Sequence, residues 1–112
     1  MNSVVRTTPD GAFDALDRFL RGRLLRQLDA LRGGQVALVD ALGSTLVGEA
    51  GHGPAIRLQV HDAGFYRALA GQGSVGAAEA FMDRHWDCSD LVGLVRLLVR
   101  NRDLLDGMEG GP

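Results

Sequence analysis

The sequence predicts an α+β domain in which a small antiparallel sheet packs against helices. Three observations lead to this prediction: apolar residues at helical spacing early in the chain, short β-rich segments between glycine-containing turns in the middle, and helical spacing again towards the end. Elements in this order bury their apolar faces best as helices layered on one sheet. A length of 112 residues fits one domain, and a hydrophobic content of 46% supplies a core and argues against disorder.

The first helix is expected at residues 9–31. Thr8 can cap its first turn, and Gly33 and Gly34 can end it. Apolar residues at helical spacing form its expected buried face, namely Phe13, Leu16, Leu20, Leu24, Leu28 and Leu31. Two ion pairs between residues four apart are expected on the opposite side, Asp14–Arg18 and Asp17–Arg21.

Three short strands are expected next, at residues 35–41, 45–49 and 55–61. The last of them alternates cleanly, with its apolar residues on one face and its polar residues on the other. Because the glycine-containing breaks between the strands are short, they favour an antiparallel meander with one buried face.

Helical spacing returns after Asp62, where one short helix is expected. A second helix is expected from Val75 to Asp83, and Ser74 can cap it. Trp86 is expected in a brief extended piece, buried and holding the last helix against the sheet.

The last helix is expected at residues 90–102, capped by Cys88 or Ser89. Its expected buried face consists of Leu91, Leu94, Val95 and Leu98. The glycine-rich tail at residues 107–112 is typical of the beginning of a linker, so the folded domain is expected to cover residues 1–106.

Composition argues against several classes of function. A formal net charge of −2 gives no global attraction to nucleic acid. The single cysteine, Cys88, rules out an internal disulfide and suits a reducing cytosol. No apolar run reaches the roughly 20 residues that cross a bilayer. A cytoplasmic location is therefore expected, with peripheral contact at the inner membrane face left open.

Three short motifs suggest chemistry but have plainer explanations. Residues 71–76 spell the dinucleotide fingerprint G-x-G-x-x-G, but no buried strand precedes them, so a tight turn into a helix is preferred. His85 and Cys88 are too few ligands for a metal site, and a structural cysteine is preferred to a nucleophile. Glu79 is either a boundary carboxylate with a polar partner or a contact to another domain. No catalytic residue and no metal site are expected.

The most informative residues lie between Gly64 and Asn101. In order, they are Phe65, Tyr66, Arg67, Leu69, Gly73, Ser74, Gly76, Glu79, Phe81, Met82, Asp83, Trp86, Asp87, Cys88, Asp90, Leu91, Arg100 and Asn101. This pattern resembles the amino-terminal, non-catalytic region of bacterial cyclopropane fatty acid synthases. Those enzymes use S-adenosylmethionine to add a methylene bridge to cis-unsaturated acyl chains of phospholipids. The sequence departs from the family pattern at Ala78 and Arg84, where the family usually has glycine.

The resemblance implies a lipid-binding accessory domain that does no chemistry alone. Its partners would be phospholipid acyl chains, the membrane surface, a second copy of the chain, and a methyltransferase domain after residue 112. S-adenosylmethionine would bind that missing domain, and no cofactor is expected in this chain. Clustered aromatic and apolar side chains suit either a core or a lipid-pocket wall, and the implied lipid-binding residues are Phe65, Tyr66, Phe81, Met82 and Trp86. The residues implied in contact with the catalytic domain are Gly73, Gly76, Glu79, Asp83 and Arg84.

Residues 55–101 are also similar to the sterol carrier protein fold, in which the sequence AFM precedes a short strand and an apolar helix. Here Ala80, Phe81 and Met82 occupy those places. Domains of that fold hold apolar ligands in a tunnel between sheet and helices. Two alternatives stay open: a free-standing lipid carrier of the sterol carrier type, and a docking or dimerisation domain without a lipid site.

Overall fold

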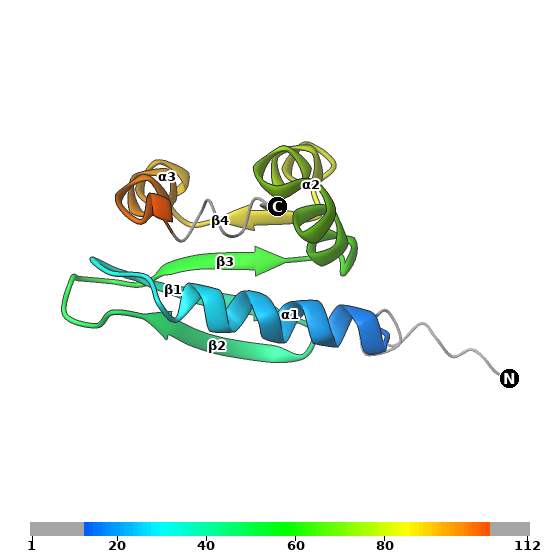
Figure 1. The fold of residues 1–112 in the computed structure, drawn as a ribbon, viewed down its shortest axis with the longest axis horizontal. Helices are drawn as coiled ribbons and strands as arrows, with labels where there is room; N and C mark the ends of the chain where they lie inside the picture. Colours follow the sequence, from blue (N-terminus) through cyan, green and yellow to red (C-terminus); the bar gives the residue numbers. More distant parts are fainter. Residues whose placement is uncertain (1–12, 104–112) are drawn as a thin grey trace, which may run out of the picture.

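The computed structural model describes residues 13–103, and it confirms the predicted α+β class (Figure 1). The expected start of the first helix at residues 9–12, its cap at Thr8 and the expected linker at residues 107–112 lie outside the described residues. In chain order, the elements are α1 (Ala15–Leu28), β1 (Gln35–Asp40), β2 (Gly43–Gly48), β3 (Ile56–Val60), α2 (Gly64–Met82), β4 (Trp86–Cys88) and α3 (Leu91–Arg100).

The four strands form a mixed sheet in the order β2-β1-β3-β4. β1 pairs antiparallel with β2 and parallel with β3, and β3 pairs antiparallel with β4. The predicted antiparallel meander is therefore wrong at β3, which lies beside β1 instead of β2. This arrangement sets Leu38 of β1 next to Leu58 of β3, so the two strands with buried leucines occupy the centre of the sheet.

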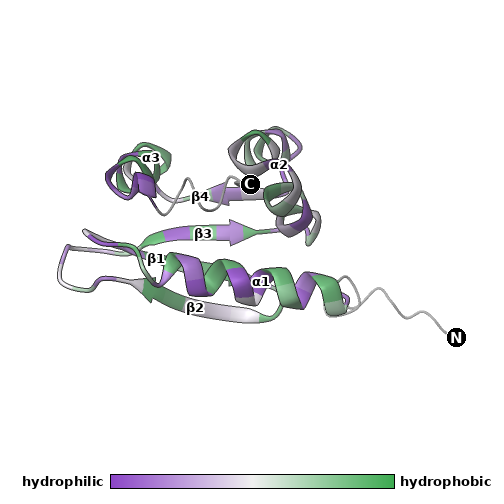
Figure 2. Cartoon of the chain, viewed as in Figure 1, coloured by the Kyte–Doolittle hydropathy of each residue, from purple (hydrophilic) through white to green (hydrophobic). Residues whose placement is uncertain are grey.

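The core lies between one face of this sheet and the helices. α1 runs along β1 and β2, and α2 and α3 lie on the side of β4 (Figure 1). Figure 2 shows hydrophobic and hydrophilic residues alternating along α1, as its spacing predicts. Most of the predicted buried face of this helix is confirmed, but Leu16 is 48% exposed. In the first turn of α1 the buried residue is Asp17, whose carboxylate faces Arg67 of α2, and the neighbouring Leu16 faces the solvent.

The first turn of α1 is closed by acidic residues that also hold α2. Asp14 is the N-cap: its carboxylate accepts a hydrogen bond from the Asp17 backbone, and the Asp17 carboxylate accepts one from the Asp14 backbone. Both carboxylates pair with Arg67 of α2, whose Nε lies 2.8 Å from the Asp17 carboxylate. The predicted pairs with Arg18 and Arg21 are wrong, because these carboxylates face the second helix.

α2 is bent at Gly73, where φ is 57° and ψ is −135°. The two helical segments predicted in this region are thus present, joined at a residue whose conformation only glycine adopts without strain. The segments press together at Gly76, where an added Cβ atom would lie 2.0 Å from the Ala68 carbonyl oxygen. The G-x-G-x-x-G motif therefore lies within a helical region, where two of its glycines allow the bend and the close packing.

The carboxyl end of α2 closes with a left-handed residue that is not glycine. The backbone amide of His85 donates to the Ala80 carbonyl at 2.8 Å, and that of Arg84 donates to the Phe81 carbonyl at 3.0 Å. These two bonds form a Schellman motif around Arg84, whose φ is 63°. An L-residue with a Cβ atom is strained in this conformation.

Replacing Arg84 with glycine should therefore raise the free energy of unfolding by about 0.5 to 1 kcal/mol, because glycine adopts the left-handed conformation without the Cβ clash. The shift in the urea midpoint measures the gain. Arg84→Ala is the matched control, since it removes the charge and keeps the Cβ atom. Equal stabilisation by both variants would assign the gain to the charge and contradict the backbone explanation.

α3 begins at Asp90, whose carboxylate accepts a hydrogen bond from the Gly93 amide at 2.9 Å. The predicted caps at Cys88 and Ser89 are wrong, and the Ser89 hydroxyl instead accepts a hydrogen bond from the Arg57 amide. Leu94 and Leu97 are the buried residues of this helix. Leu91 and Val95 were expected inside and are exposed, because α3 has apolar residues on both sides and spacing alone does not choose between them.

The end of α3 is joined to the loop after α1 by one side-chain amide. Asn101 accepts a hydrogen bond from the Arg32 amide and donates one to the Arg32 carbonyl, both at 2.9 Å. Its amide also donates to the Leu97 carbonyl at 2.8 Å, which closes the last turn of α3. One residue thus ends the helix and fixes its position against a loop far away in the sequence.

Candidate ligand-binding cavity

An apolar cavity of about 90 Å³ lies between the three helices and the sheet. Its exposed wall is entirely apolar, and each helix contributes to it as well as β3 and β4. The bend of α2 lies at the wall, so the backbone of Gly73 borders the space without a side chain to fill it. The lining residues are Leu24, Leu28, Leu58, Phe65, Leu69, Gly73, Ser74, Ala77, Trp86, Leu94 and Leu98.

Three of the five residues predicted to bind lipid are buried, and two of these line the cavity. Phe65 and Trp86 border it, with ring centroids 5.5 Å apart. The Trp86 indole nitrogen donates to the Ala77 carbonyl at 2.8 Å, which ties β4 to α2. The expected burial of Trp86 is confirmed, and its hydrogen bond goes to α2, not to the last helix.

Phe81 and Met82 lie on the other side of Trp86 and face a shallow surface groove. The rings of Phe81 and Trp86 meet edge to face, with centroids 5.1 Å apart. Met82 is 73% exposed. Trp86 therefore lies between the cavity and this groove, and Phe81 and Met82 do not reach the cavity.

Tyr66 points away from the cavity, towards a buried carboxylate. Its hydroxyl donates to Asp40 at 2.5 Å, and Arg21 Nε donates to the same oxygen at 2.7 Å. The other carboxylate oxygen accepts from the Leu42 amide at 2.9 Å. Burial first, and the hydrogen bond to Asp40 second, raise the pKa of the Tyr66 phenol well above its ordinary value. Tyr66 therefore stays a neutral donor that helps satisfy a buried charge.

The residues predicted to contact another domain divide into two groups. Gly73 and Gly76 are buried in α2, and the backbone that approaches Gly76 closely is that of Ala68 in the same helix. Their small size thus serves the bend and offers no outer surface. Glu79, Asp83 and Arg84 are exposed at the carboxyl end of α2 and around its last turn.

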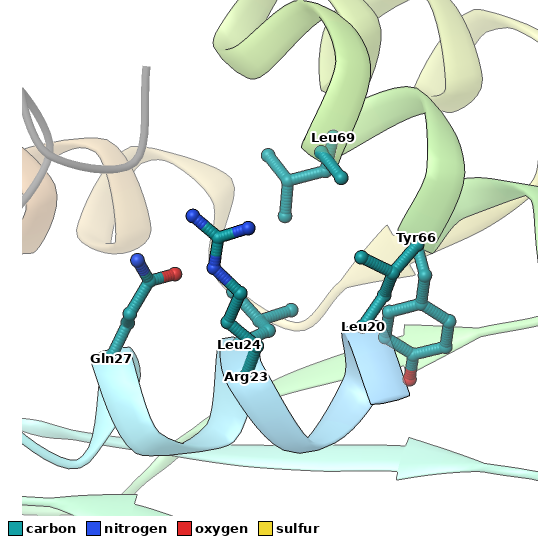
Figure 3. Close-up of a pocket in the computed structure, with 7 residues that line it drawn as sticks. Leu20, Arg23, Leu24, Gln27, Tyr66 and Leu69 are labelled. Atoms are coloured by element: carbon teal, nitrogen blue, oxygen red, sulfur yellow. The ribbon is translucent and has the colours of Figure 1, made fainter. Parts of the chain in front are cut away.

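A groove between α1 and α2 adjoins the cavity (Figure 3). Two leucines, Leu24 and Leu69, line both spaces and form the boundary between them. Arg23 and Gln27 rise from α1 at the groove. The sequence interpretation missed this groove and the leucine walls of the cavity. Helical spacing identified Leu24 and Leu28 as core, but nothing in the pattern marks a core leucine that borders an empty space.

The titratable groups of residues 13–103 form no group of three His, Cys, Asp or Glu that could hold a metal ion. Burial raises the pKa of the Cys88 thiol, which lowers its thiolate fraction at neutral pH. His61 Nε2 lies 2.8 Å from an exposed Asp87 carboxylate oxygen. The arrangement that stands out is therefore the apolar cavity with its polar-rimmed groove.

Comparisons with protein-family models, curated proteins and solved structures found no match to this chain. The resemblances to cyclopropane fatty acid synthases and to sterol carrier proteins thus stay predictions. None of the helices within residues 13–103 combines the length and the apolar character that crossing a bilayer requires.

Proposed function

We propose that this domain binds the acyl chain of a lipid in the cavity between the helices and the sheet. The observation that carries the proposal is the wall, which is apolar throughout and is drawn from all three helices. Burying a methylene group in such a place gains about 0.8 kcal/mol. A hydrocarbon chain matches these surroundings, and a polar ligand would lose its hydrogen bonds to water there.

The volume favours the end of a chain over a whole lipid. Ligand sites commonly measure about 300 to 1,000 Å³, and this cavity measures about 90 Å³. It can take a few methylene groups, and deeper entry needs a wall to move. α3 contributes Leu94 and Leu98 to the wall, and Asn101 joins the end of this helix to the loop after α1.

The resemblance to cyclopropane fatty acid synthases supplies the biological setting of the proposal. In that setting the domain presents an acyl chain to a methyltransferase domain, which binds S-adenosylmethionine and does the chemistry. Exposed Glu79, Asp83 and Arg84 are the proposed contacts to that domain. Mixed polar surfaces of this kind are typical between domains of one chain.

Trp86 provides a direct test because it is the only tryptophan and lines the cavity. Bromine quenches tryptophan fluorescence on contact, so stearic acid brominated near its methyl end should quench Trp86 strongly. Stearic acid brominated near its carboxyl group should quench it less. Ala77→Leu should weaken binding about tenfold, the equivalent of losing roughly two buried methylenes, because the new side chain fills the cavity.

Ala78→Leu is the matched control, since Ala78 is the next residue along α2 and is exposed. It should bind the brominated acid like the parent, and urea unfolding should show that both variants are folded. Unchanged binding by a folded Ala77→Leu variant would place the chain outside the cavity. A free-standing lipid carrier would use the same cavity, and only the presence of a methyltransferase domain separates it from the accessory role.

One surface favours a second candidate, a docking or dimerisation domain without a lipid site. Four apolar side chains of α3 are exposed and lie near one another at helical spacing. Absence of quenching by either brominated acid would favour this candidate. The exposed residues are Leu91, Val92, Val95 and Val99.

A further inference from the structure

We propose that the groove between α1 and α2 binds the anionic head group of the amphiphile whose acyl chain enters the cavity. Arg23 would supply the positive charge and the Gln27 amide a hydrogen-bond donor. This inference rests on the proposed function and adds to it the chemical class of the ligand, an acyl chain that ends in a carboxylate or a phosphate.

The first observation is the arrangement of the groove. Arg23 and Gln27 are four residues apart, so they lie on one face of α1. Figure 3 shows both polar ends rising from α1 into the space below α2, opposite Leu69. The remaining lining is largely apolar, from Leu20, Leu24 and Ala70 among others. A charged end and an apolar wall in one groove match the two halves of an amphiphile.

The second observation is that neither polar end has a partner in the described part of the chain. Within residues 13–103, the side chains of Arg23 and Gln27 make no ion pair or hydrogen bond. Other arginines nearby are occupied: Arg21 by Asp40, and Arg67 by Asp14 and Asp17. No acidic residue is among those lining the groove.

The third observation is that the groove adjoins the cavity. Leu24 and Leu69 border both spaces, so a chain passing between them would run from the groove to the rings of Phe65 and Trp86. Tyr66 also lines the groove, but its hydroxyl donates to the buried Asp40 carboxylate. Arg23 and Gln27 are thus the available head-group contacts. The planar guanidinium group suits carboxylate and phosphate equally, since both accept two parallel hydrogen bonds.

The test compares probes that share a chain and differ in the head group. Stearic acid brominated near its methyl end should bind the parent more tightly than the matching brominated alcohol, by a factor of up to about five, the upper end of the range for one exposed ion pair. Quenching of Trp86 fluorescence measures the binding of both probes. Arg23→Gln should remove this preference and leave binding of the alcohol unchanged. Arg26→Gln is the control, because Arg26 is exposed on the same helix and does not line the groove.

A third probe, a lysophosphatidic acid with the same brominated chain, separates the two sources of negative charge. If Arg23→Gln weakens this probe more than the fatty acid, the natural head is a phosphate, and the reverse result points to a free fatty acid. Equal affinity of the parent for acid and alcohol would overturn the inference while leaving the cavity function intact. The inference would also be overturned if Arg23→Gln and Arg26→Gln weakened binding of the acid equally, because that result would indicate only a general attraction of the anion to the positive charges of α1. Absence of quenching by all three probes would remove the proposed function itself.

Discussion

Replacing Asp40 with alanine should lower the free energy of unfolding by about 3 to 5 kcal/mol, the range for removing one partner of a buried ion pair. The Asp40 side chain is fully buried, and the Arg21 side chain is only 15% exposed. The carboxylate accepts hydrogen bonds from Arg21, Tyr66 and the Leu42 backbone. All three donors lose their acceptor in the variant, and none regains full contact with water. Urea unfolding measures the loss.

A double-mutant cycle with Tyr66→Phe identifies the cause. Tyr66→Phe alone should cost about 1.5 to 3 kcal/mol, because it removes one hydrogen bond to a charged group. In the Asp40→Ala background it should cost much less, since the tyrosine hydroxyl no longer has its acceptor. Additive losses would show that the two side chains do not act together, which would contradict the network.

Replacing Trp86 with alanine should also cost about 3 to 5 kcal/mol. Trp86 is 7% exposed and packs between Phe65 and Phe81. Its loss would enlarge the cavity and break the hydrogen bond to the Ala77 carbonyl. A decrease in the urea midpoint at unchanged m-value is the expected signature, because the fold should persist with a larger internal void.

Phe19→Ala is the control for this variant, since Phe19 is an aromatic residue that is 59% exposed. It should change the free energy of unfolding by less than about 0.5 kcal/mol. Trp86→Phe should fall between the two, because it keeps a ring at this position and loses the indole hydrogen bond. If Trp86→Ala unfolds at the parent midpoint, the tryptophan is not a packing element of this core.

Local patterns in the sequence were enough to place the elements. Helical spacing located α1, the two segments of α2 and α3, and alternation located β3. The neighbour of β3 in the sheet was beyond those patterns, because pairing with β1 or with β2 satisfies the same alternation. The ion pairs of Asp14 and Asp17 were also beyond local patterns, because their partner, Arg67, lies on another helix.

The candidate site was predictable only in part. The family resemblance and the clustering of aromatic and apolar residues singled out Phe65 and Trp86, which do border the cavity. They also singled out Phe81 and Met82, because sequence does not show on which side of Trp86 a neighbour falls. The hydrogen bond from the Tyr66 hydroxyl to Asp40 was not predicted, since the two residues are 26 positions apart and no local pattern links them.

The pairing of Asn101 with the Arg32 backbone has a consequence for the order of assembly. These residues are 69 positions apart, whereas the β1–β2 hairpin turns within a few residues. Because the entropy cost of closing a loop grows with its length, the hairpin is expected to form early and the docking of α3 late. Contacts made after the folding transition state affect unfolding more than folding. The step that encloses the cavity would thus come last on the folding pathway, and its reversal would be the first opening from the native state.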